Sequence, residues 1–181
     1  MLIARGKKTE NIAEYLLYMW QIEDLMRALA LDIEKIQTYI IDQFDQPTAV
    51  KKEMRDWYES LLEMMRLENV TVSGHLQINK NVISELDELH NVLLGLPKEN
   101  FYLMTYHKVL PLIVELRAKP GGKAFGEVET CLNLLYGMLL LRLQKKEISD
   151  ETAHAASLIG EFLRMLSAKY KQDKEEGLDL E

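Results

Sequence analysis

The chain of 181 residues contains one cysteine, Cys131, so it cannot form an intramolecular disulfide. The same count excludes a zinc site built on a C-x-x-C pair. Four prolines and nine glycines leave little room for long irregular segments. These scarcities predict a chain made mostly of regular structure, and nothing in the cysteine content points to an oxidising compartment.

Long hydrophobic runs are also missing. The longest, CLNLLYGMLLL at 131–141, is far shorter than the roughly 20 residues that a helix needs to cross a bilayer. The N-terminal sequence MLIARGKK has basic residues but no hydrophobic core of the kind found in signal peptides. We therefore expect a cytoplasmic protein that does not span or bind a membrane.

Catalytic motifs are absent from the sequence. It contains no G-x-x-x-x-G-K-[ST], G-x-G-x-x-G, H-E-x-x-H or G-x-S-x-G pattern. Cys131 lies in an apolar run and is best interpreted as a small buried hydrophobic residue, because no base can be placed beside it. His75 and His107 are better interpreted as polar helix or loop residues than as general bases. The sequence thus predicts no catalytic residue and no cofactor.

Helical periodicity is the dominant signal that the sequence does contain. Apolar residues step by three and four along one face of the first segment: Tyr15, Met19, Ile22, Met26, Leu29, Ile33, Ile36 and Ile40. With Thr9 as N-cap, this stripe predicts one long helix over 10–43. A break near Asp32, itself a possible N-cap, is the alternative.

Five further stripes follow, each bounded by turn or cap residues. They predict helices near 50–65, 78–93, 98–119, 128–143 and 149–170, with Pro111 inside the fourth helix of the chain and Ser149 opening the last. No alternating pattern typical of a strand is present. The fold class that follows is all-α: a single-domain antiparallel bundle of about six helices with a long N-terminal helix. The domain spans 1–172, and 173–181 form a frayed charged tail.

Two glycines lie inside predicted helices, at Gly137 and Gly160. Each costs about 1 kcal/mol relative to alanine in a helix interior. Close approach of neighbouring helices is the expected reason for both, ahead of a ligand-binding role.

The segment at 16–20 is apolar on every side of its helix turn. Either this helix is central to the bundle or its second face meets a partner. A seven-residue row beside the main stripe would form a homodimer seam in the second case: Tyr18, Leu25, Asp32 and Tyr39. A central helix explains the pattern with fewer assumptions.

Charge argues against nucleic acid as a partner. The net charge is −7, and eight acidic residues stand against two basic ones between positions 10 and 45. One segment at 69–86 could still form the turn and recognition helix of a helix-turn-helix motif, with Ser73 as cap and Gln77, Asn79 and Lys80 exposed. This helix-turn-helix alternative has little basic charge nearby to support it.

A carboxylate-histidine metal-binding bundle is the other alternative. An acidic residue three positions before a histidine places both side chains on one helical face, as in di-iron bundles. Two such pairs occur, Asp87 with His90 and Glu151 with His154. Chance alone produces such pairs readily in a chain with 29 acidic residues, so no metal is assigned.

Several polar or aromatic residues interrupt the apolar faces and are the candidates for a partner or ligand surface. They are Trp20, Gln21, Asp24, His75, Gln77, His90 and Tyr136. Each also has a structural interpretation as part of the core or its rim.

The segments ENIAEYLLYMWQIEDL, GHLQINKNVISELDELH and LYGMLLLRLQKKEIS, with the stop at KPGG, resemble a family of uncharacterised bacterial proteins of this size. The resemblance covers nearly the whole chain and implies an all-helical domain of unknown function with no activity to carry over. Together with the composition, it leads us to expect a non-catalytic helical bundle that binds itself, as a homodimer, or another protein.

Overall fold

The fold is entirely helical over the part of the chain that the computed structural model describes, residues 2–119 and 125–177. No strand occurs within these ranges, and none of their helices is long and apolar enough to cross a membrane. The elements are α1 (Leu2–Glu10), α2 (Ile12–Ala28), α3 (Ile33–Tyr39), the 3-10 helix η1 (Ile41–Gln43), α4 (Thr48–Leu67), α5 (Gln77–Leu94), α6 (Asn100–Ala118), α7 (Glu127–Leu143) and α8 (Asp150–Glu176). The all-helical bundle predicted from the sequence is confirmed.

The long N-terminal helix predicted over 10–43 is wrong, because the chain divides there into α2, α3 and η1. Ala30 and Leu31 both take left-handed backbone conformations, with φ of 57° and 56°, which no helix can accommodate. Asp32 then accepts hydrogen bonds from the backbone amides of Glu34 and Lys35 and begins α3. The alternative, a break with Asp32 as N-cap, is confirmed.

The start of this region also differs from the prediction. Thr9 is not an N-cap; it lies inside α1, where its hydroxyl donates to the carbonyl of Arg5. Asn11 caps α2 instead, accepting from the amides of Ala13 and Glu14. The basic N-terminal segment is therefore a helix of its own, and Ala4 packs from it into the core.

The five later helices match their predicted positions to within a few residues, and Ser149 caps α8 by accepting from the amide of Thr152. Helix α8 extends to Glu176, so much of the tail predicted to be frayed is helical. Residues 178–181 lie outside the described part of the chain. With α1 and α3 added, the described residues form eight α-helices where about six were expected.

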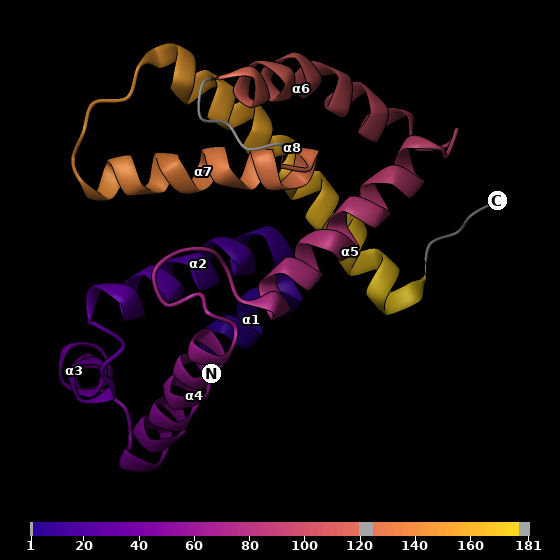
Figure 1. The fold of residues 1–181 in the computed structure, drawn as a ribbon. Coiled ribbons are helices and arrows are strands. Elements are labelled where there is room, and N and C mark those ends of the chain that lie inside the picture. The colour runs from indigo at the N-terminus through magenta and orange to yellow at the C-terminus, as the bar shows by residue number, and fades with distance from the viewer. Residues whose placement is uncertain (1, 120–124, 178–181) are drawn as a thin grey trace.

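Helix α2 is central to the bundle. It packs against α1, α5, α7 and α8, and Leu16 and Trp20 are fully buried. Figure 1 shows α6 and α7 in one half of the molecule and α3 and α4 in the other, with α2 and α5 between them and α8 running from beside α6 past α5. The central position explains why residues 16–20 are apolar on all sides. The break at Ala30 and Leu31 also interrupts the proposed homodimer seam, so its four residues share no continuous face.

The two helix-interior glycines are not explained by close helix approach, as the sequence had led us to expect. A Cβ atom built on Gly137 or on Gly160 would meet no atom within 4 Å. Both therefore face open space, and alanine would fit at either position.

Candidate functional site

Four of the predicted surface residues meet at one contact between α2, the loop at 68–76 and α7. Trp20 stacks on His75 with ring centroids 4.2 Å apart, and Tyr136 contacts the Trp20 ring edge-on at 5.5 Å. The Tyr136 hydroxyl donates to Oδ2 of Asp24 at 2.5 Å. Residues separated by more than 100 positions in sequence thus form a single cluster, which we call the Glu23 network after the residue at its centre.

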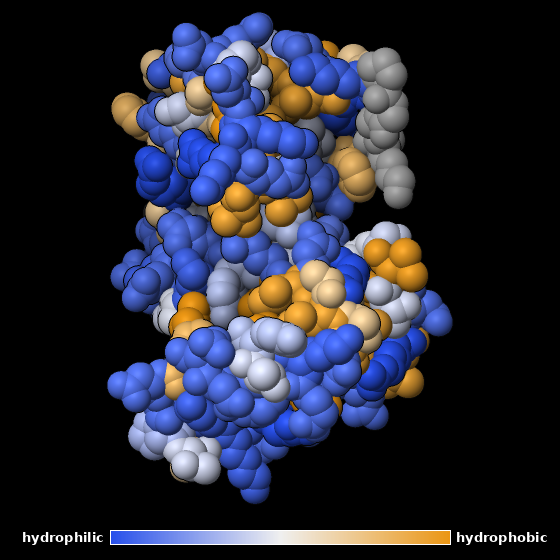
Figure 2. Space-filling view, turned by 90° about the vertical axis from the view of Figure 1, so that its left-hand side faces the viewer, coloured by the Kyte–Doolittle hydropathy of each residue, from blue (hydrophilic) through white to orange (hydrophobic). Residues whose placement is uncertain are grey.

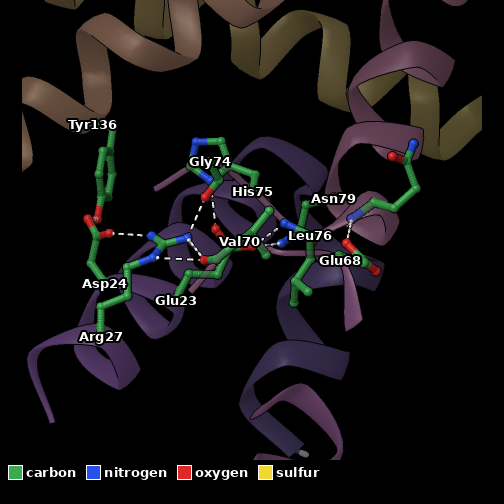
Figure 3. A network of polar contacts seen from close by, with 11 residues as sticks. Glu23, Asp24, Arg27, Glu68, Val70, Gly74, His75, Leu76, Asn79 and Tyr136 are labelled. Carbon is green, nitrogen blue, oxygen red and sulfur yellow. Dashed lines mark hydrogen bonds and ion pairs between the residues drawn. The ribbon is translucent and has the colours of Figure 1, made fainter. Parts of the chain in front are cut away.

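Glu23 is a fully buried carboxylate in this network. Its Oε1 accepts from the backbone amide of Leu76 at 3.0 Å and from Nδ2 of Asn79 at 2.7 Å. Its Oε2 lies 2.6 Å from Nδ1 of His75. Figure 3 shows the carboxylate between these three residues. A buried charge of this kind is tolerated only when hydrogen bonds replace the water it has lost, and here three donors do so.

The network supplies the N-terminal cap that α5 lacks in its own sequence. The N-cap residue, Leu76, has no side chain that could accept a hydrogen bond. Glu23 accepts from the amide of Leu76, and Glu68 accepts from the amide of Gln77 at 2.6 Å. Carboxylates are favourable at this end of a helix because its free amides carry partial positive charge.

Arg27 fixes the loop from the opposite side. Its guanidinium donates to the carbonyl of Val70 at 3.0 Å and to the carbonyl of Gly74, where φ is 89°. Asp24 holds the same guanidinium at 2.7 Å and accepts from Tyr136. Burial, and next the hydrogen bond to Asp24, raise the pKa of Tyr136, which stays protonated at neutral pH. Side chains of α2 therefore hydrogen-bond to both backbone carbonyl groups and a backbone amide of the loop at 68–76.

The chemistry available to this site is set by His75. Its Nδ1 faces the Glu23 carboxylate, so the pair is oriented by a short hydrogen bond. The His75 side chain is 24% exposed. Among the described residues, no hydroxyl or thiol group is bonded to Nε2 of His75. The hydrogen bonds of the Glu23 network hold the loop at 68–76 in place.

The predicted surface residues therefore divide into two groups. Trp20 and His90 are buried, so their side chains are not on the outer surface of the described chain. Gln21, Asp24, His75 and Tyr136 are half-buried, and Gln77 is exposed with its amide donating to Asn81.

Glu23, Arg27 and Asn79 were not singled out from the sequence as network members. The sequence did contain a sign of the role of Glu23. The residue follows Leu16 and Trp20 at helical spacing on the second face of α2. A charge in a row that is otherwise buried needs internal partners.

A second buried cluster surrounds His90 between α5, α6, α7 and α8. Its Nδ1 lies 2.6 Å from the Tyr102 hydroxyl and its Nε2 lies 3.4 Å from Oε2 of Glu127. Burial lowers the pKa of His90, opposed by the nearby Glu127. Burial raises the pKa of Asp87, whose carboxylate also accepts from the backbone of Val128. A Cβ atom on Gly126 would lie 2.8 Å from Oδ2 of Asp87, so this glycine makes room for the carboxylate.

The structure does not bring together the two pairs considered for a metal site. His90 contacts the Phe162 ring at 5.6 Å, whereas Glu151 and His154 lie in the first turns of α8, at a groove beside the end of α6. Phe162 follows His154 by eight positions on the same helix, which corresponds to a rise of about 12 Å. Within the described ranges, no three His, Cys, Asp or Glu side chains are arranged to hold a metal ion.

The helix-turn-helix alternative also meets geometric obstacles. Asn79 is fully buried against Glu23, and Ser73 does not cap α5. The connection at 68–76 is longer than the turn of three or four residues in such motifs. Glu23 and Glu68 occupy the helix end that would face DNA phosphates, and their charge would repel them.

Cys131, in α7 beside the His90 cluster, is expected to be nearly inert in the folded protein. Burial, and next the charges of Glu127 and Asp87, raise the pKa of its thiol to about 12. Near pH 8 the thiolate fraction is then lower by roughly 1,000-fold than for a free cysteine. We expect an aromatic disulfide reagent to modify the native thiol at least 100-fold more slowly than the thiol of protein unfolded in guanidinium. Equal rates would show that Cys131 is accessible.

Comparison with known proteins identifies the family. The profile of a domain of unknown function, DUF4924, matches residues 1–177, and the chain belongs to this family. The chain matches no curated protein and no solved structure at a significant level.

Proposed function

We propose that this member of the DUF4924 family acts without catalysis, by pairing with a second copy of itself through the outward face of α6. That face carries exposed apolar side chains: Phe101 is 74% exposed, Met104 60% and Val114 59%, and Pro111 lies between them. The opposite face of α6 is buried through Tyr102, Val109 and Ile113. Helix α6 is thus apolar on both sides, and its own chain covers only one of them.

The spacing of these four residues carries the proposal, because it suits an antiparallel contact with an identical helix. The midpoint of positions 101 and 114 lies between His107 and Lys108. The midpoint of positions 104 and 111 is the same point. In a two-fold symmetric pair with its axis at this point, Met104 lies opposite Pro111 of the second copy, and Phe101 lies level with Val114. Every apolar side chain of the face then has an apolar counterpart.

The proline adds a polar reason for pairing. Because Pro111 has no amide hydrogen, the carbonyl of His107 loses its partner within the helix. The same symmetry axis brings Lys108 of the second copy to the level of this carbonyl, where its ammonium group can donate. A helix of 19 residues gives an interface at the small end of the usual range, so we expect a dissociation constant on the order of 10 µM.

Sedimentation velocity and native mass spectrometry over a concentration series test the proposal. We expect a monomer–dimer equilibrium, and Met104→Glu should weaken it at least tenfold because a charge would be buried against Pro111. Val72→Glu is the matched control, since Val72 is 87% exposed in the loop at 68–76, away from α6, and should leave the equilibrium unchanged. A wild-type chain that stays monomeric at about 100 µM, or equal weakening by both substitutions, would contradict pairing through α6.

We also propose that the protein works in the cytoplasm of a bacterium. The lone, buried Cys131 suits a reducing compartment, where disulfides do not contribute to stability. The resemblance of the sequence to an uncharacterised bacterial family supports a bacterial source. Fractionation of a bacterium that encodes the chain, with an antibody to it, would place the protein in the soluble or the envelope fraction.

A further inference from the structure

A groove of about 610 Å³ lies between α2, α7 and α8, on a different part of the molecule from the outward face of α6. Its walls are mainly apolar, with Leu17, Leu135 and Leu139 among them, and Tyr18, Gln21 and Arg142 stand at its rim. Figure 2 faces the hollow between α7 above and α2 below, and hydrophobic side chains gather along it. Its volume lies within the range of small-molecule sites, about 300–1,000 Å³.

The hollow exists because the third wall has short side chains. Helix α8 contributes Ala153, Ala156 and Ser157 where α2 and α7 contribute leucines. The next residue on this face of α8 is Gly160, which has open space around it. Longer side chains here would have filled the gap with the protein's own atoms, as they do elsewhere in the core.

The rim carries one uncompensated positive charge. Lys7 and Glu14 both line the groove, but they neutralise each other in an ion pair of 3.0 Å. Arg142 is exposed and has neither an ion pair nor a hydrogen bond within the described ranges. A free guanidinium at the mouth of an apolar groove, on a protein with a net charge of −7, favours a ligand with an anionic end.

We propose that this groove binds a free medium-chain carboxylate, with its hydrocarbon tail along Leu17, Leu135 and Leu139 and its head facing Arg142. The inference is independent of pairing through α6, because no residue of α6 lines the groove. Each methylene that enters the groove should tighten binding roughly fourfold.

Isothermal titration with octanoate, decanoate and 1-octanol, each below its aggregation limit, tests the tail and the head separately. We expect saturable binding of one carboxylate per chain, with decanoate more than about tenfold tighter than octanoate. Arg142→Gln should weaken octanoate about tenfold and leave 1-octanol unchanged. Arg164→Gln is the matched control, because Arg164 is exposed on α8 and does not line the groove.

A second variant addresses the groove itself. Ala153 is exposed at the groove wall, so Ala153→Trp should preserve the fold, which circular dichroism verifies, and should abolish decanoate binding by filling the hollow. No saturable heat from wild-type protein would overturn the proposal. So would an affinity that does not depend on chain length, or decanoate binding that survives Ala153→Trp.

Discussion

Replacing Glu23 with alanine is expected to lower the free energy of unfolding by about 3–5 kcal/mol. The substitution leaves the amide of Leu76, Nδ2 of Asn79 and Nδ1 of His75 without an acceptor inside the protein. It also removes a cap from α5 and the contact that joins α2 to the loop at 68–76. Urea denaturation at neutral pH, followed by far-ultraviolet circular dichroism, measures the loss.

One further variant separates the hydrogen bonds of Glu23 from its charge, and another serves as a surface control. Glu23→Gln keeps one acceptor oxygen for Leu76 and Asn79, so we expect a smaller loss of about 1–2 kcal/mol. Glu14→Ala removes an exposed glutamate on the same helix whose ion pair with Lys7 is at the surface, and should cost less than about 0.5 kcal/mol. If Glu23→Ala were as mild as Glu14→Ala, the network would not stabilise the fold.

Replacing Trp20 with alanine should cost a similar amount, about 3–5 kcal/mol, for a different reason. The side chain is 0% exposed and lies between the rings of His75 and Tyr136. Its removal leaves a cavity that the surrounding side chains can close only in part. Thermal and urea unfolding of the variant measure the loss.

Controls for Trp20 come from a conservative change and from the other tryptophan. Trp20→Phe should cost only about 1–2 kcal/mol, because most of the ring contact is kept and the Nε1 hydrogen that is lost has no acceptor within the described part of the chain. Trp57→Ala, at a half-buried position in α4, should cost less than Trp20→Ala. A fully stable Trp20→Ala protein that no longer dimerises would instead make Trp20 an interface residue and contradict the structure.

The later helices could be predicted because their signals are local. From α4 to α8, each apolar stripe repeats every three to four residues, and several are bounded by a glycine, a proline or an N-cap such as Ser149. The break between α2 and α3 could not be predicted with certainty, because the two left-handed residues are alanine and leucine. Neither residue marks a turn in a sequence, and only Asp32 gave a local signal.

The Glu23 network escaped prediction because its contacts are distant in sequence. Glu23 meets Asn79 across 56 positions and Tyr136 meets Asp24 across 112. Periodicity shows which residues share a helix face, but it does not show which faces meet. For the same reason the helix-turn-helix alternative placed Asn79 on a DNA-reading surface, although it is buried against a carboxylate.

The packing of α2 against α8 sets a condition on how the protein is made. The amide of Ala13 donates to the Ser167 hydroxyl oxygen at 3.3 Å, across 154 positions of sequence. At a translation rate of about 5–20 residues per second, the ribosome needs on the order of ten seconds to add this stretch. During that time the apolar face of α2 that α8 later covers is exposed on the nascent chain. The native contacts of α2 can therefore be completed only after α8 has been synthesised.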